Sequence, residues 1–200
     1  KYHKRILSPE WINKCYSDWV TQDAMEKFLS KKNTPTKNFE KAQDNVLHVL
    51  HLEKLTRNLR KDAALRILDF GCGWGLFLAS CDSFGFKSYG IDFSPDRRQQ
   101  GRVHIFPDIE DLKNSTDKEL FHVITMFEVL EHLANPFEVL QSLSKLLMTG
   151  GILVLETPDC TGVTNIVTDL DYRKIHPLSH INGFTPSTQR SIAERAGFKL

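Results

Sequence analysis

The sequence predicts an α/β domain in which a doubly wound, mostly parallel sheet carries helices on both faces. Short apolar runs that suit buried strands alternate along the chain with amphipathic stretches that suit helices. The runs are continuously apolar, which is typical of strands covered on both sides. Right-handed crossovers between such strands give the doubly wound arrangement, and 200 residues suffice for one such domain.

Composition and charge exclude several classes of protein. With 40% hydrophobic and 26% charged residues the chain has ordinary globular values, so wholesale disorder is not expected. No apolar run approaches the roughly 20 residues of a membrane-spanning helix, and the net charge of +1 demands no polyanionic partner. The four cysteines are scattered without paired spacing, which favours free thiols in a reducing compartment and hence a cytoplasmic location.

The first predicted element is a helix, because apolar residues recur every three or four positions from Phe39 to Leu59. The members of this stripe are Phe39, Ala42, Val46, Val49, Leu52, Leu55 and Leu59. Apolar runs after residue 61 predict strands at residues 65–70, 86–91, 102–106, 121–127 and 152–155. Residues 76–84 predict a helix between the first two strands.

A further helix has both a start and a stop signal. Asn135 can cap it, Pro136 suits its first position, and Glu138 follows three residues after the cap. Gly150 and Gly151 can end it in the left-handed conformation. Its buried face is expected from Val139, Leu140, Leu143, Leu146 and Leu147.

The loop after the first predicted strand carries an acid and three glycines. Ligands of doubly wound sheets bind beyond the carboxyl ends of the strands, so the loop from Asp69 to Gly75 is the first candidate site. The dinucleotide fingerprint G-x-G-x-x-G needs a glycine where Leu76 stands, and here the third glycine comes one place early. This spacing disfavours a nicotinamide-dependent dehydrogenase, and three glycines with an acid disfavour a purely structural turn.

Acids also follow the second and third predicted strands. Asp92 can accept both hydroxyls of a ribose, and Phe93 beside it can pack on an adenine ring. Asp92 could instead cap a helix that begins at Pro95. Asp108, with Ile109 after it, stands where an adenine amino group could donate. Three strand ends are therefore consistent with one nucleoside ligand.

Three motifs taken in order resemble those of class I S-adenosylmethionine-dependent methyltransferases. They are Ile-Leu-Asp-Phe-Gly-Cys-Gly-Trp-Gly at residues 67–75, Gly-Ile-Asp at 90–92 and Phe-Glu-Val-Leu-Glu-His-Leu at 127–133. Residues 150–159 and 176–186 resemble a narrower branch, whose fifth strand ends in Glu-Thr-Pro-Asn and which includes ubiquinone-biosynthesis O-methyltransferases. The likeness runs from about residue 64 to residue 200. It implies a Rossmann-like fold that binds S-adenosylmethionine and releases S-adenosylhomocysteine.

The resemblance also implies roles for residues at the strand ends. The set expected to contact the cofactor is Asp69, Gly71, Cys72, Gly73, Asp92, Phe93, Asp108, Ile109, Phe127 and Glu128. Its glycines would pass close to the methionine portion, and Asp69 would assist the ammonium group. Asp92 would hold the ribose, Asp108 would bind the adenine amino group, and Phe93 would flank the adenine. Phe127 and Glu128 would line the reacting end.

The sequence departs from the family pattern at two places. His122 stands near the start of the fourth strand, where the family usually has Asp. The family fold finishes with an antiparallel pair of strands, whereas this chain stops as the sixth strand begins. Because an open sheet edge is a liability, we expect the native protein to continue past Leu200.

Residues 1–60 lie outside the resemblance and are expected to form a helical cap over the pocket, as N-terminal segments do in similar enzymes. Residues 61–200 would then be the methyltransferase domain. Trp11, Tyr16 and Trp19 could face the acceptor, but packing of the cap onto the core is the favoured interpretation.

Candidate catalytic groups follow from the chemistry of methyl transfer. The reaction is an in-line displacement, for which the enzyme aligns the acceptor and, for a hydroxyl, removes or polarises its proton. The candidates are the carboxylate of Glu131 and the imidazoles of His132, His176 and His180, which titrate near neutrality. Each of these could also be an ordinary surface or loop residue.

A metal hypothesis follows from spacing. Glu128, Glu131 and His132 stand at i, i+3 and i+4, so on a helix they would share one face. They could ligate a divalent cation, with His176 or His180 completing the site. Glu-x-x-Glu-His recurs in metal-dependent relatives, including catechol and small-RNA 3′-end methyltransferases, and also in many members that use no metal.

The favoured function is an S-adenosylmethionine-dependent methyltransferase that acts on a small-molecule acceptor at oxygen. The alternatives are a non-catalytic S-adenosylmethionine-binding module of a larger protein and an RNA-end methyltransferase, with a nicotinamide-dependent dehydrogenase behind them. The near-neutral charge and the lack of a basic-aromatic stripe disfavour nucleic acid as a partner. The sequence predicts no membrane association and leaves the oligomeric state open.

Overall fold

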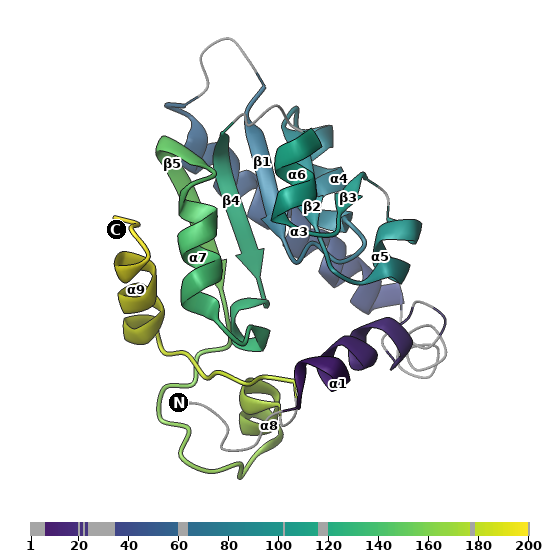
Figure 1. Ribbon diagram of the computed structural model, residues 1–200, viewed down its shortest axis with the longest axis vertical. Helices are drawn as coiled ribbons and strands as arrows, with labels where there is room; N and C mark the ends of the chain where they lie inside the picture. The colour runs from purple at the N-terminus through teal and green to yellow at the C-terminus, as the bar shows by residue number, and fades with distance from the viewer. Residues whose placement is uncertain are drawn as a thin grey trace.

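The computed structural model describes residues 7–19, 21, 23, 35–59, 64–101, 103–115, 120–176 and 179–199. Within these residues, one sheet lies between two layers of helices (Figure 1). The strands are β1 (Arg66–Phe70), β2 (Lys87–Ile91), β3 (Ile105–Phe106), β4 (Phe121–Phe127) and β5 (Leu147–Glu156). They pair in the order β3-β2-β1-β4-β5, and every pairing is parallel. The predicted doubly wound parallel sheet is confirmed, and the strand order reverses between β1 and β4.

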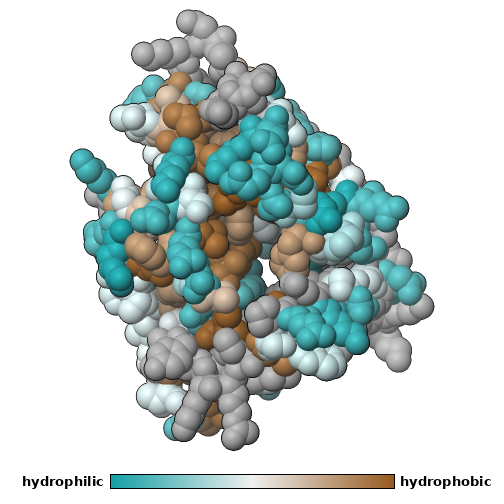
Figure 2. All heavy atoms as spheres, viewed as in Figure 1, coloured by the Kyte–Doolittle hydropathy of each residue, from teal (hydrophilic) through white to brown (hydrophobic). Residues whose placement is uncertain are grey.

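Two hydrophobic clusters hold the helices to the sheet. On one face α3 (Pro35–Thr56) and α4 (Leu76–Ser83) pack on the sheet, and on the other lie α6 (Ile109–Ser115), α7 (Pro136–Ser144) and α9 (Pro186–Arg195). Successive strand residues point to opposite faces, so Ile67 joins the first cluster and Leu68 the second. The outer sides of the helices are hydrophilic, and hydrophobic residues show between them (Figure 2).

The remaining elements gather at the carboxyl ends of the strands. They are α1 (Pro9–Lys14), η1 (Cys15–Trp19), α5 (Pro95–Gln100), η2 (Leu130–His132) and α8 (Asp169–Ile175). Figure 1 shows α1 and α8 beyond the ends to which the strands point. In the part of the chain that the structure describes, no helix combines the length and the apolar composition needed to cross a membrane.

The stripe predicted for the first long helix is only partly buried. Val49 and Leu52 of α3 lie in the core, whereas Val46 is 39% and Leu55 54% exposed. Regular spacing alone does not show how many members of a stripe a sheet can cover. The side chain of Phe39 lies outside the described residues. Among the aromatic residues expected in the cap, Trp11 is 47% exposed beside Lys14, and the side chains of Tyr16 and Trp19 are not described.

The prediction that Gly150 and Gly151 end a helix is wrong. α7 already ends at Ser144, and both glycines lie within β5. Phe121 pairs with Leu147 but Val123 pairs with Ile152, so β5 bulges between these pairs. Gly150, with a φ of 80°, supplies the left-handed conformation that a bulge requires as readily as a helix end does. Leu147 therefore belongs to the strand and not to the helix.

Smaller differences concern the element ends. β3 begins at Ile105 and not at residue 102, which lies outside the described residues. The side chain of Asn135 makes no capping bond to the backbone of α7. His122 stands where the family usually has Asp, and its Nδ1 accepts the Arg66 N–H at 3.0 Å. Burial and the nearby Arg66 charge lower the pKa of His122, which keeps that nitrogen an acceptor.

Candidate cofactor and active site

A cavity of about 460 Å³ opens where β1, β2, β3 and β4 end. Its walls come from α1, α5, η2, the first turn of α6 and the loops after these strands. The lining residues are Ile12, Phe70, Gly71, Ile91, Asp92, Phe93, Arg97, Pro107, Asp108, Ile109, Glu110, Glu128, Val129, His132 and Leu133. Six of the ten predicted cofactor residues line this cavity, and they follow β1, β2, β3 and β4: Gly71, Asp92, Phe93, Asp108, Ile109 and Glu128.

The glycine loop after β1 passes along the cavity. Gly71 has a φ of 82° and donates its N–H to the Ile91 carbonyl at 2.7 Å. A Cβ at Gly71 would collide with the side chain of Val129. Gly73 has a φ of 58°, and nothing lies within 4 Å of the place where its Cβ would be. Glycine is therefore required for close packing at the first position and leaves open space at the second.

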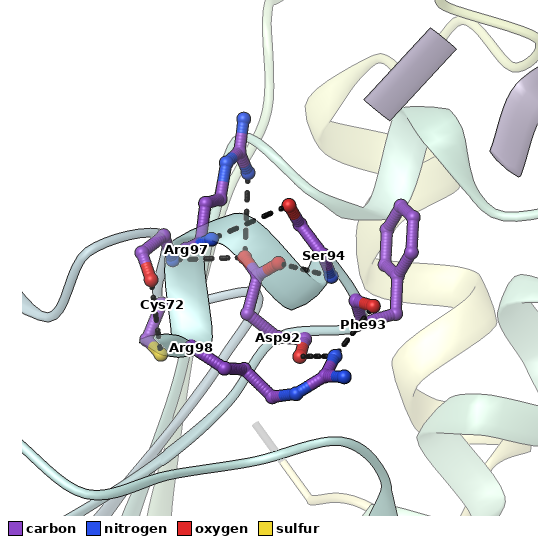
Figure 3. Close-up of polar contacts among 7 residues, drawn as sticks. Cys72, Asp92, Phe93, Ser94, Arg97 and Arg98 are labelled. Atoms are coloured by element: carbon purple, nitrogen blue, oxygen red, sulfur yellow. Dashed lines mark hydrogen bonds and ion pairs between the residues drawn. The ribbon is translucent and has the colours of Figure 1, made fainter. Parts of the chain in front are cut away.

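Asp92, at the end of β2, is 2% exposed and holds the loop together. Its Oδ2 accepts the Gly73 N–H at 3.0 Å and faces Arg97 Nη1 at 3.3 Å, and its Oδ1 accepts the Ser94 N–H at 2.9 Å. Figure 3 shows these contacts converging on the carboxylate, while the Phe93 ring points away from it. Phe93 is 49% exposed at the cavity. Both the predicted ribose residue and the predicted adenine residue therefore line one pocket.

The end of β3 contributes Asp108 and Ile109, as the sequence predicted. Asp108 Oδ1 accepts the Asp111 N–H at 2.9 Å, so the carboxylate also stabilises the first turn of α6. Ile109, Pro107 and Glu110 line the cavity beside it. This part of the wall combines an apolar surface with one carboxylate.

Two predicted cofactor residues lie behind the cavity wall. Asp69 is 4% exposed and its Oδ1 accepts the Thr125 hydroxyl at 2.7 Å. Burial, with a contribution from the Asp92 charge, raises the pKa of Asp69 to about 7. Cys72 packs its Sγ into the space left by the missing side chain of Gly90. Burial raises the pKa of the Cys72 thiol.

Phe127 and Glu128, predicted to line the reacting end together, diverge at the end of β4. Glu128 has a φ of 55° and lines the cavity. Burial raises the pKa of its carboxyl, and the Glu156 charge adds to this. The Phe127 ring instead stacks on His48 of α3, with ring centres 4.5 Å apart. His48 Nε2 lies 3.1 Å from Glu156 Oε2, a contact that the sequence analysis missed.

Glu131, His132 and His180 form a cluster at the edge of the cavity. One ligand atom from each lies within 4.8 Å of the others. The Asn182 N–H donates to the Glu131 carbonyl at 3.0 Å, and this bond fixes the segment that carries His180 against η2. Glu128 is not in the group, and the predicted shared helix face is wrong. β4 is followed by a short 3₁₀ turn, which holds only Glu131 and His132 of the three.

The cluster is electrostatically unusual. Glu131 is 1% exposed, and neither of its carboxylate oxygens has a hydrogen-bond partner among the described residues. Burial raises the pKa of Glu131 to about 7. His132 donates Nδ1–H to the Ser179 carbonyl at 2.7 Å, and its Nε2 lies 4.0 Å from Glu131 Oε1. Burial lowers the pKa of His132 to about 4, so its imidazole is neutral at pH 7.

His176 lies beside this cluster but outside it. It is exposed, its Nδ1 bonds to the Ser179 hydroxyl, and its ring centre is 5.5 Å from that of His180. His180 itself is 9% exposed and donates Nδ1–H to the Lys174 carbonyl at 3.0 Å. The structure thus brings His180, and not His176, to Glu131 and His132.

The chain belongs to a family of methyltransferase domains. The model of this family, described as "Methyltransferase domain", matches residues 36–200.

Among curated relatives, the chain is 30% identical to a ubiquinone biosynthesis O-methyltransferase of Glaesserella parasuis over 69% of this chain and 64% of the relative. It is 35% identical to a mitochondrial ubiquinone biosynthesis O-methyltransferase of Candida albicans over 48% of this chain and 33% of the relative. The chain therefore spans from one third to less than two thirds of the length of these relatives.

Solved structures show the same fold. The plantazolicin methyltransferase BpumL, solved with a monoazolic desmethylPZN analogue and S-adenosylhomocysteine, matches with a TM-score of 0.61 at 19% identity, over 92% of this chain and 73% of that one. An S-adenosylmethionine-dependent methyltransferase from Archaeoglobus fulgidus matches with a TM-score of 0.55 at 23% identity, over 76% of this chain and 69% of that one. At these identities the likeness establishes the fold.

Proposed function

We propose that this chain binds S-adenosylmethionine in the cavity at the strand ends and transfers its methyl group to an oxygen of a small-molecule acceptor. The observation that carries the proposal is the convergence of Gly71, Asp92 and Asp108 from three successive strand ends on one cavity. The family membership and the O-methyltransferase relatives support the same activity.

The residues present fit such a cofactor. Asp92 supplies a buried carboxylate for ribose hydroxyls, and the apolar wall of Phe93, Pro107 and Ile109 suits an adenine ring. Gly73 leaves open space where a side chain would stand, next to the expected methionine portion. When bound, S-adenosylmethionine supplies an electrophilic methyl group on a sulfonium. The task of this chain is then to orient the acceptor and to exclude water.

We further propose that Glu131, His132 and His180 hold a divalent cation. A buried carboxylate without hydrogen-bond partners is costly unless a ligand satisfies it. The neutral imidazole of His132 has the protonation state that metal binding requires. A bound cation would supply a Lewis acid that polarises an acceptor hydroxyl. The Nδ1–H bonds of both imidazoles to backbone carbonyls would fix their orientation toward it.

A labelled-methyl assay tests both proposals. The purified chain is given S-adenosylmethionine with catechols, simple phenols and, separately, a short RNA, with and without a chelator. We expect methylation of a hydroxylated small molecule, at least about tenfold loss in chelator, and recovery on adding back Mg²⁺ or Zn²⁺.

Full turnover in chelator would contradict the cation and leave Glu131 and the histidines as acid–base groups. Transfer to RNA alone would contradict the small-molecule acceptor. S-adenosylhomocysteine binding without transfer to any acceptor would favour a binding module.

We also propose that the protein is cytoplasmic and that its partner is a small molecule. The scattered cysteines support a cytoplasmic location. The balance of acidic and basic residues supports a small-molecule partner over a nucleic acid.

A further inference from the structure

Arg97 lines the proposed cofactor cavity and has no place in the roles derived above. It is the one cavity-lining residue with a permanent positive charge in the part of the chain that the structure describes. Its side chain is 18% exposed, and its guanidinium lies 5.2 Å from the centre of the Trp74 ring. Its Nη1 reaches Asp92 Oδ2 at 3.3 Å.

The number of hydrogen bonds that the Asp92 carboxylate can accept determines whether Arg97 and a ribose can bind to it together. A carboxylate has about four lone-pair sites for donors. Within the described residues, three are used by the Gly73 N–H, the Ser94 N–H and Arg97. A ribose held through both of its hydroxyls needs two sites. One protein donor must therefore leave Asp92 before both hydroxyls can bind to it.

Arg97 is the donor that can leave. The N–H groups of Gly73 and Ser94 belong to the backbone of the glycine loop and of the start of α5, and Ser94 also caps that helix. Moving either would rebuild a turn. The Arg97 guanidinium is at the end of a flexible side chain, and its contact with Asp92 is the longest of the three. After leaving Asp92, its charge would still have the Trp74 ring as a partner.

We infer that Arg97 competes with the cofactor ribose for Asp92, so that it limits affinity for the nucleoside instead of contributing to it. The inference rests on the proposed cofactor site. The competition also weakens Asp92 as an acceptor, because a nearby positive charge stabilises the carboxylate. S-adenosylmethionine carries one more positive charge than S-adenosylhomocysteine, so Arg97 disfavours the methyl donor more than the product.

The test uses Arg97→Met, which keeps an unbranched apolar stem without the charge. The matched control is Arg98→Met, because Arg98 Nη1, as far as the described residues show, bonds to the main-chain carbonyls of Asp92 and Phe93 and not to the Asp92 carboxylate. Calorimetry measures affinity for S-adenosylhomocysteine and for its 2′-deoxy and 3′-deoxy analogues. We expect Arg97→Met to bind S-adenosylhomocysteine about threefold to tenfold more tightly, the value of one hydrogen bond.

The deoxy analogues separate competition from a merely structural role. In the unaltered chain, Asp92 has one free lone-pair site for the two ribose hydroxyls. Removing one of these hydroxyls should therefore weaken binding less than about twofold. In Arg97→Met both deoxy analogues should bind at least about threefold more weakly than S-adenosylhomocysteine. Arg98→Met should leave the ratios between ligands unchanged. If Arg97→Met does not fold, Arg97→Gln serves the same comparison.

Three results would overturn the inference. Weaker binding of S-adenosylhomocysteine by folded Arg97→Met would make Arg97 a support for Asp92. Unchanged ratios between the ligands would contradict competition at the ribose, even if Asp92→Ala abolishes binding and so upholds the site itself. Failure of the unaltered chain to bind S-adenosylhomocysteine would overturn the proposed function together with this inference.

Discussion

Two buried carboxylates, one at each end of the candidate site, differ in how the chain satisfies them. Asp92 is 2% exposed and receives two backbone N–H groups and an arginine. Glu131 is 1% exposed and receives no hydrogen bond from the described residues. Equal burial therefore does not imply an equal role. The chain itself satisfies the Asp92 carboxylate, whereas the Glu131 carboxylate has no donor among the described residues, as expected of a group in the proposed cation site.

The two carboxylates also differ in how far along the chain their neighbours in the site lie. Two donors to Asp92 lie within five residues of it, and the third, the Gly73 N–H, lies 19 residues earlier in the chain, so the network joins the loop after β1 to the start of α5. The Glu131 cluster depends on His180, which reaches it through the bond between the Asn182 N–H and the Glu131 carbonyl. A site built from distant segments costs more chain entropy and is expected to form late in folding.

The largest effect is expected for Asp92→Ala. It removes the proposed acceptor of the ribose hydroxyls and leaves three protein donors without their carboxylate. We expect S-adenosylhomocysteine binding to weaken at least about 100-fold and the free energy of unfolding to fall by about 2–4 kcal/mol. Calorimetry and urea denaturation measure these quantities. Asp111→Ala, at an exposed site of α6, is the control. Unchanged affinity would remove Asp92 from the ribose site.

Glu131→Gln should separate activity from stability. The neutral amide keeps the shape of the side chain but removes the buried charge. We expect methyl transfer to fall at least about 100-fold, while the free energy of unfolding near pH 8 stays the same or rises by about 1–2 kcal/mol. Glu194→Gln, at an exposed position of α9, should change neither quantity. A clear loss of stability would mean that Glu131 has structural partners and that the contrast with Asp92 fails.

Gly71→Ala tests the contact that joins the two ends. Its Cβ would meet Val129, which precedes the turn carrying Glu131 and His132, and its φ of 82° disfavours any side chain. We expect a loss of about 2–4 kcal/mol in the free energy of unfolding. Gly73→Ala, with a φ of 58° and open space around its Cβ, should cost only about 1 kcal/mol. Equal losses by denaturation would show that backbone conformation alone determines both effects.

The smallest effect concerns the pH dependence of stability at the Asp92 end. Burial raises the pKa of Asp69 from 3.8 to about 7, so the folded state holds its proton more tightly than the unfolded state. Its contribution to stability is full below pH 4 and is lost as the pH rises to 7. Asp69→Asn should therefore stabilise the chain by about 1–2 kcal/mol at pH 8 and not at pH 4. Denaturation curves at both values measure this, and an equal effect at both would place the pKa of Asp69 near its ordinary value.

The sequence predicted the fold, and the placement of Asp92 at the cavity, because their signals are local. A buried strand, a glycine turn and an acid at the strand end all fall within a few residues, as at Asp69 to Gly73. The error at Gly150 had a physical source, because a left-handed glycine serves a bulge and a helix end alike. Arg97 was missed because an arginine on a short helix usually faces solvent.

At the Glu131 end, the prediction grouped Glu131 with His132 but wrongly added Glu128, and it left His176 and His180 as alternatives. The i, i+3, i+4 spacing assumes a helix, and a 3₁₀ turn after a left-handed residue removed Glu128 from the group. The choice between His176 and His180 depended on contacts made across many residues, which no local pattern encodes. The neutral state of His132 likewise comes from burial that only the folded chain provides.

At Glu128, the backbone conformation favours glycine, whereas the cavity uses a carboxylate side chain. Its φ of 55° is one that glycine adopts at no steric cost and that a glutamate adopts only at about 1–2 kcal/mol. Selection for stability alone would favour replacement by glycine, and the cavity would then lose a carboxylate. If related sequences keep an acid at this position, selection for activity maintains it. If they carry glycine instead, that selection has relaxed in those proteins.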